Sequence, residues 1–192
     1  MSMKSLSDES LDPQVLAEKQ KDPRWGAQLL RQISIFGYLH DDELAELYAL
    51  GNTLTQAAKS NTVIEGENSR GLFIILAGKV SVYKRDTSSN RLLRLTYLEP
   101  GASFGELSLF DDAPRSATIT AESTCTLFSL EQKGFQDYLN RKGDNLKARF
   151  YQKCAEDMTE RFRKQNDDYI ISQHLLWKHA LRRETPTGGP GE

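Results

Sequence analysis

The chain has 192 residues, with 25 lysine and arginine residues against 27 aspartate and glutamate residues. The net charge of -2 creates no overall positive field, which argues against DNA or an anionic membrane surface as a partner. The length suits one domain of ordinary size with short appendages and argues against two full domains. The longest apolar stretch, Leu72–Ala77, is too short to span a bilayer, and no N-terminal apolar run is typical of a signal peptide. We therefore expect a soluble, cytoplasmic protein.

The N-terminal part is predicted to be a polar tail followed by helices over residues 12–52. Residues 1–11 are polar and Ser-rich, which predicts a disordered tail. Asp12-Pro13 and Asp22-Pro23 each place an N-cap residue before a proline at the first helical position, which predicts two short helices ending near Ile35. A third helix is predicted from Asp41, because acidic residues occupy its first turn and apolar residues follow at helical spacing. Its apolar face consists of Leu44, Leu47, Tyr48 and Leu50.

The middle of the chain, residues 53–130, is predicted to contain closely spaced short strands. From about Asn61 the apolar runs are of the β type, and several alternate with polar residues. A polar turn at Asp86–Asn90 separates two of them. Strands at this spacing are typical of a sandwich or a barrel. The candidate strands are Thr62–Ile64, Leu72–Leu76, Val80–Tyr83, Arg91–Leu98, Ala117–Ala121 and Cys125–Leu130.

The C-terminal part, residues 131–184, is predicted to be helical. One helix covers Gly134–Leu139, a break is expected near Lys142–Asp144, and a long helix follows over Asn145–Arg183. Residues 185–192, rich in glycine and proline, predict a flexible tail that leaves no room for a helix-turn-helix motif. Residues 12–184 are therefore expected to form a single domain.

Apolar residues recur every seven positions along the long helix. These are Ala148, Ala155, Phe162, Tyr169 and Leu176. The repeat indicates an apolar seam, so we expect a homodimer through this helix. The second set of positions that a coiled coil would need to be apolar becomes polar toward the C-terminus. This argues against a coiled coil along the whole helix, and half of the helix could pack on the strands instead.

The most informative segment is Gly101–Thr118, which combines backbone amides and an arginine in the way an anion site requires. Gly105 lacks a Cβ, and the residues after it begin a short helical turn whose first N–H groups have no internal partner. Such groups attract phosphate. Arg115 adds a planar guanidinium that grips two phosphate oxygens, and Pro114 stiffens the chain that leads into it.

Glu106 would repel a phosphate, so it requires a different partner within the same ligand. A ribose 2′-OH can donate to this carboxylate, and the ionised acceptor strengthens the bond. The segment therefore predicts a phosphate on a ribose with a free 2′-OH. Other interpretations remain open: Glu106 as a surface acid, Arg115 as an ion-pair partner of Asp111 or Asp112, and the two serines, Ser108 and Ser116, as caps of a tight turn.

The motifs Phe104-Gly-Glu-Leu-Ser-Leu and Ala113-Pro-Arg-Ser-Ala-Thr resemble the phosphate-binding cassette of cyclic nucleotide-binding domains, here residues 104–118. Upstream, Glu65-Gly-Glu and Gly71–Val80 resemble the first strands of that family's roll. The resemblance covers about positions 36–140. It implies an α+β fold, an antiparallel β-roll of the jelly-roll type flanked by N-terminal helices and a long C-terminal helix.

The resemblance also implies which residues bind the ligand. Glu106 and the amide of Gly105 would take the ribose 2′-OH, whereas Arg115 and the amides of Ser108 and Ser116 would take the cyclic phosphate. Leu107 and Ala117 lie within the same matched motifs and complete the set of ligand-binding residues. Tyr169 or Trp177 could serve as the lid over the base, although core or interface packing is the simpler interpretation of both aromatic residues.

These motifs predict a sensor of cAMP or cGMP, not an enzyme, that signals to an effector protein through its C-terminal helices. In the family a threonine after the arginine accompanies a preference for cGMP, and Ser116 here favours cAMP. The alternatives are a regulatory fragment of a larger enzyme, such as a diguanylate cyclase or kinase, and a ligand-gated transcription regulator. No cofactor or metal site is expected, because His174 and His179 point about 140° apart on a helix and the strand region contains no histidine. Cys125 and Cys154 are expected to be reduced and buried.

Overall fold

The computed structural model describes residues 13–183, and the predicted tails 1–11 and 185–192 lie outside that range. The chain forms two compact units that meet between Ala148 and Arg149. The first unit contains the N-terminal helices, all the strands and the start of the long helix, and the second contains the rest of that helix. The expected single domain over residues 12–184 stays a prediction.

The N-terminal helices are short, and one of the two predicted caps lies within the described residues. They are α1 (Pro13–Lys19), α2 (Pro23–Arg31), the 3₁₀ helix η1 (Ser34–Phe36) and α3 (Asp41–Tyr48). Asp22 has an extended backbone, and its carboxylate accepts a hydrogen bond of 2.9 Å from the amide of Arg24, with Pro23 at the first helical position. This confirms the predicted cap of α2, whereas Asp12 lies outside the described residues.

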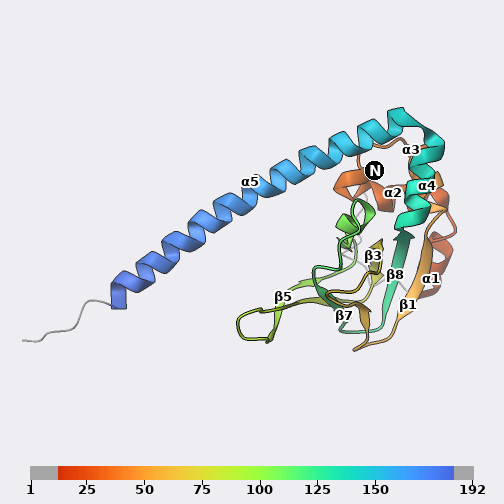
Figure 1. Cartoon of the computed structure of the whole chain (residues 1–192). Coiled ribbons are helices and arrows are strands. Elements are labelled where there is room, and N and C mark those ends of the chain that lie inside the picture. The colour runs from red at the N-terminus through yellow and green to blue at the C-terminus, as the bar shows by residue number, and fades with distance from the viewer. Residues whose placement is uncertain (1–12, 184–192) are drawn as a thin grey trace, which may run out of the picture. The chain divides into compact units, whose positions relative to one another are not determined.

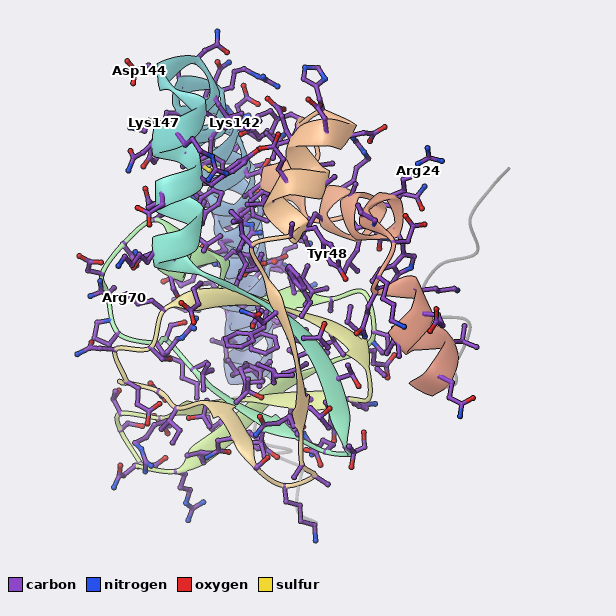
Figure 2. All side chains as sticks on the ribbon, turned by 90° about the vertical axis from the view of Figure 1, so that its right-hand side faces the viewer. Arg24, Tyr48, Arg70, Lys142, Asp144 and Lys147 are labelled. Atoms are coloured by element: carbon purple, nitrogen blue, oxygen red, sulfur yellow. The ribbon has the colours of Figure 1, made fainter. Side chains whose placement is uncertain are left out.

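Tyr48 joins the helices to the strands. Its ring stacks on Phe128 with 4.8 Å between centroids and meets the edge of Trp25 at 6.2 Å. A Cβ on Gly26 would lie 2.1 Å from Cδ1 of this ring, so only glycine permits the approach. Figure 2 shows Tyr48 where the helices adjoin the strands.

The strands form two antiparallel sheets of four strands each within the described residues, which confirms the predicted antiparallel β-roll and α+β class. Their orders are β1-β8-β3-β6 and β2-β7-β4-β5. Figure 1 labels β1, β3 and β8 of the first sheet and β5 and β7 of the second. Apolar residues from both sheets, including Ile75 and Leu127 of one and Val80 and Ile119 of the other, form a shared core. The strands are β1 (Asn52–Gln56), β2 (Asn61–Val63), β3 (Gly71–Ala77), β4 (Val80–Arg85), β5 (Leu92–Leu98), β6 (Ser103–Phe104), β7 (Thr118–Ala121) and β8 (Cys125–Glu131).

Two helices follow the roll, α4 (Gln132–Lys142) and α5 (Asp144–Arg183). Gly143, with φ 89°, separates them, and this confirms the predicted break (Figure 2 labels Lys142 and Asp144 on either side). Tyr138 of α4 is fully buried, and its hydroxyl donates a 2.9 Å hydrogen bond to the carbonyl of Glu43 in α3. Burial raises the pKa of this phenol, so it remains a donor.

The second unit is the part of α5 from Arg149 onward. Three of the predicted seam residues expose most of their side chains, with fractions of 63% for Phe162, 64% for Tyr169 and 62% for Leu176. The side chains of 179–183 are not described. In the part of the chain that the structure describes, every helix is too short or too polar to cross a membrane.

Candidate functional site

Arg115, just before β7, is a buried cation that polar neutral groups hold in place. It is 6% exposed, and its Nε donates to Oγ of Ser69 at 3.1 Å. Its Nη1 donates to Oγ of Ser108 at 2.5 Å and its Nη2 to the carbonyl of Gly71 at 2.9 Å. Burial lowers the pKa of this guanidinium from its ordinary value, but an arginine keeps its charge.

The described residues place no carboxylate against this guanidinium. Asp112 pairs with Arg70 at 2.5 Å, and the carboxylate of Asp111 accepts from the amide of Ala113 at 3.3 Å. The alternative of an ion pair between Arg115 and either aspartate is therefore wrong for this structure. A buried charge without a partner of opposite sign is costly, so the arrangement favours an anionic ligand.

Gly105 allows the cassette to approach the guanidinium. Its φ is 82°, in the left-handed region, and a Cβ there would lie 2.4 Å from Nη1 of Arg115 and 2.6 Å from the carbonyl oxygen of Gly71. Both backbone conformation and space therefore require glycine. The next residues form the predicted short helix, the 3₁₀ helix η2 (Glu106–Leu109).

The residues of η2 differ in what they offer a ligand. Glu106 is half-buried, and its carboxylate accepts a 2.9 Å hydrogen bond from Oγ of Ser103. Leu107 is 51% exposed, whereas Ser108 is buried. The amide of Ser108 donates to the carbonyl of Gly105 at 3.1 Å, so a phosphate would have to share or replace that bond. Its predicted phosphate contact stays a prediction.

The other end of the site is the segment from Arg115 to Ala117. The amide of Arg115 donates to the carbonyl of Glu67, and the amide of Gly66 donates to the carbonyl of Arg115, both at 2.9 Å. Ser116 is exposed and Ala117 half-buried. The loop between β2 and β3 therefore fixes the backbone on which the predicted phosphate contacts depend.

The family model described as cyclic nucleotide-binding domain matches residues 57–142. The crystal structure of the N-terminal domain of a transcriptional regulator from Streptomyces coelicolor is 31% identical, with a TM-score of 0.63, and the match covers 73% of this chain and 93% of that one. The chain belongs to the cyclic nucleotide-binding domain family. Domains of this family are regulatory and take a cyclic nucleotide as ligand.

Two further relatives of this cyclic nucleotide-binding domain have titles that mention cAMP. A cAMP-dependent protein kinase regulatory subunit from Blumeria graminis is 30% identical over 175 residues, 81% of this chain and 45% of the relative. The co-crystal structure of the regulatory domain of Toxoplasma gondii PKA with cAMP is 26% identical, with a TM-score of 0.57, covering 67% of this chain and 46% of that one. The chain thus spans less than half the length of the curated relatives it matches first.

The structure brings the ligand-binding residues predicted in the cyclic nucleotide-binding domain into one region, and it adds partners that the sequence did not reveal. Ser69, Ser103 and the carbonyl of Gly71 hold the two charged side chains of the site. Ser69 precedes β3 in an exposed loop, and no residue pattern distinguishes it there. The family resemblance of Glu65-Gly-Glu and Gly71–Val80, on either side of Ser69, was the available signal that this region adjoins the cassette.

The predicted lid residues belong to the second unit. Tyr169 is 64% exposed and Trp177 66%, and the cassette belongs to the first unit. Their role as a lid stays a prediction. Among residues 13–183, no group of three or more histidine, cysteine or acidic side chains is placed to hold a metal ion.

Proposed function

We propose that this domain binds cAMP reversibly, with Arg115 on the cyclic phosphate and Glu106 on the ribose 2′-OH. The observation on which this proposal rests is the buried guanidinium, which has hydroxyls and a carbonyl for partners but no carboxylate among the described residues. One relative is a cAMP-dependent protein kinase regulatory subunit and another was crystallised with cAMP, which supports this nucleotide over cGMP. Ser116 after the arginine supports the same choice.

The hydrogen bonds of Arg115 leave it suited to a phosphate. A guanidinium has five N–H donors in one plane, and the contacts with described residues use one on each of its three nitrogens. Each terminal nitrogen therefore keeps one N–H for a ligand. A guanidinium with a donor left on each terminal nitrogen can bond two oxygens of one phosphate, which a lysine could not do.

The carboxylate of Glu106 supplies the second contact in this proposal. Ser103 donates to one of its oxygens, so the carboxylate is oriented before a ligand arrives. An ionised acceptor bonds a ribose hydroxyl more strongly than a neutral one does. A 2′-deoxy or 2′-O-methyl analogue should therefore bind more weakly than cAMP.

The signal in this proposal is a shift between arrangements of the C-terminal helices. A ligand changes such an equilibrium only if it binds one arrangement better than the other. The apolar seam of α5 supports a homodimer, because the exposed Phe162, Tyr169 and Leu176 would be buried between two copies. Sedimentation equilibrium of the whole chain with and without cAMP measures both the dimer and its dependence on ligand.

Calorimetric titration with cAMP and cGMP tests the ligand assignment. Removing a charge-assisted hydrogen bond costs about 1.5–3 kcal/mol, so Arg115→Ala should weaken cAMP binding roughly 10- to 100-fold. Glu106→Ala should weaken it in the same direction. The matched control is Arg70→Ala, because Arg70 is an exposed arginine in the loop between β2 and β3, where Figure 2 labels it. It forms an ion pair with Asp112.

Three outcomes of this titration can be distinguished. Retained affinity in Arg70→Ala together with lost affinity in Arg115→Ala, at an unchanged circular dichroism spectrum, supports the assignment. A wild-type chain that binds neither nucleotide contradicts it. Tighter binding of cGMP than of cAMP would contradict the choice of nucleotide alone.

A further inference from the structure

Lys84, near the end of β4, contacts the phosphate end of the candidate site from outside the cassette. Its Nζ donates to the carbonyl of Ser116 at 2.7 Å and lies 3.3 Å from Oε1 of Glu65. The side chain is half-exposed, with 50% of its surface accessible. No sequence motif assigns this lysine to the site, because β4 lies more than thirty positions before Ser116.

Glu65 fixes the position of this lysine. Its second carboxylate oxygen, Oε2, accepts a 2.8 Å hydrogen bond from the amide of Arg85 in β4. Its own amide donates to Oγ1 of Thr118 in β7 at 3.0 Å. The amide of Arg85 and the ammonium of Lys84 both lower the pKa of this carboxyl, which keeps it ionised at neutral pH. Glu65 is therefore tied both to β4 and to the strand that follows the cassette.

These contacts determine where two backbone amides of the site point. In a trans peptide the N–H points opposite to the C=O, and no cis peptide occurs among the described residues. The carbonyl of Arg115 is bonded to Gly66, so the amide of Ser116 points away from the loop. The carbonyl of Ser116 is bonded to Lys84, so the amide of Ala117 points away from β4.

We propose that Lys84 is a positioning residue for the phosphate end of this site, acting through the carbonyl of Ser116, and that Glu65 holds Lys84 in place. The proposal rests on the proposed function, because it concerns the same cyclic nucleotide. The lysine polarises the peptide between Ser116 and Ala117 and orients its N–H for the ligand. The paired carboxylate directs the ammonium toward the carbonyl.

Titration of cAMP into Lys84→Met measures this role. Loss of one hydrogen bond should weaken binding about fivefold. Lys84→Arg, which keeps the charge and a donor, should bind within about twofold of the wild type. The matched control is Lys79→Met: Lys79 has 43% of its side chain exposed, forms an ion pair with Glu99 at 3.0 Å, and its loss changes the net charge equally.

A double-mutant cycle tests the part of Glu65. Glu65→Gln should weaken binding in the same direction as Lys84→Met, and the double variant should bind no worse than Lys84→Met alone. The ¹H–¹⁵N resonance of the Ala117 amide gives a second readout, which a purely structural ion pair would not move. It should shift in ligand-free Lys84→Met and stay in place in Lys79→Met.

The outcomes separate this proposal from the proposed function. A wild-type chain that binds no cyclic nucleotide overturns both. Normal affinity in Lys84→Met, or an equal loss in Lys79→Met, overturns the role of Lys84 while leaving the proposed function intact. Additive losses in the double variant overturn the role of Glu65. A fall in the unfolding midpoint that accounts for the lost affinity would also overturn the positioning role.

Discussion

The roll buries a core of large apolar side chains, whereas the C-terminal part of α5 exposes such side chains. In the roll, Phe128 is 1% exposed and Ile75 is fully buried. Along α5, Phe162 and Leu176 expose more than 60% of their surface. A helix gains most of its stability from packing an apolar face. The roll provides such packing within itself, whereas for this part of α5 the proposed second copy would provide it.

The same substitution in the two regions should give very different results. Phe128→Ala removes the ring that stacks on Tyr48 and leaves a cavity in the core, which should cost about 3–5 kcal/mol of the free energy of unfolding. Phe162→Ala should change the free energy of unfolding of a dilute, monomeric chain by less than about 0.5 kcal/mol. Urea unfolding followed by circular dichroism measures both values.

Phe162→Ala should instead weaken self-association, because its ring belongs to the proposed dimer seam. Sedimentation equilibrium at several concentrations measures the dissociation constant. Comparable destabilisation by both variants in the monomer would remove the contrast between the two regions.

In the first unit, Gly26 is one of the glycines that have no room for a Cβ. Alanine is the better helix former by about 1 kcal/mol, but its Cβ would overlap the ring of Tyr48. Phe128 and Trp25 restrict the movement of that ring, so the clash should prevail and Gly26→Ala should destabilise by roughly 1–3 kcal/mol. Gly134→Ala in α4, where a Cβ would have no neighbour within 4 Å, is the control and should stabilise the protein. If Gly26→Ala stabilised the protein, the ring of Tyr48 would have to be able to move aside.

Two glycines of the roll separate backbone strain from ligand binding. Gly105 and Gly66 have φ values of 82° and 87°, so alanine at either should cost about 1 kcal/mol of stability. Only Gly105→Ala would also displace the guanidinium of Arg115, because a Cβ on Gly66 meets nothing within 4 Å. We therefore expect roughly tenfold weaker cAMP binding for Gly105→Ala alone. Equal affinities in calorimetry would show that Arg115 does not depend on this approach.

The smallest effect concerns the two thiols, one in each unit. Cys125 and Cys154 are free and buried, as predicted, and burial raises the pKa of Cys154 to about 12. At pH 8 only about one Cys154 in ten thousand would be a thiolate, and the thiolate is the reactive form. A thiol-specific reagent should therefore modify the folded chain slowly and the urea-unfolded chain rapidly. Rapid modification of Cys154 in the folded chain would show that this turn of α5 is open to solvent.

Local signals predicted those features that depend on a few adjacent residues. The cap at Asp22, the break at Gly143 and the short helix after Gly105 are of this kind. Two strands were missed, β1 and β6. The sequence of β1, Asn-Thr-Leu-Thr-Gln, has a single apolar side chain because it is a largely exposed edge strand, and β6 has two residues. Neither segment has enough alternation of apolar and polar residues to be recognised as a strand from the sequence.

In the candidate site, too, residues within a local motif could be predicted and residues that meet only through the fold could not. Arg115 and Gly105 could be predicted because they lie ten positions apart in a recognisable motif. Ser69 could not be predicted, because it belongs to no recognisable motif and lies forty-six positions from Arg115 in the sequence. Lys84 has the same difficulty, because its role depends on how β4 lies beside the cassette. Long-range contacts of single polar residues are set by the fold, which is why a sequence without the fold does not reveal them.

The arginine of the site is already ordered by the protein before any ligand arrives. A free arginine side chain loses up to about 2 kcal/mol of rotamer entropy when it is fixed, and here Ser69, Ser108 and Gly71 restrict it during folding. Its encounter with an anion therefore requires little side-chain rearrangement. Capture should be limited by diffusion and access, so variants of these three residues should change the association rate as well as the lifetime of the complex.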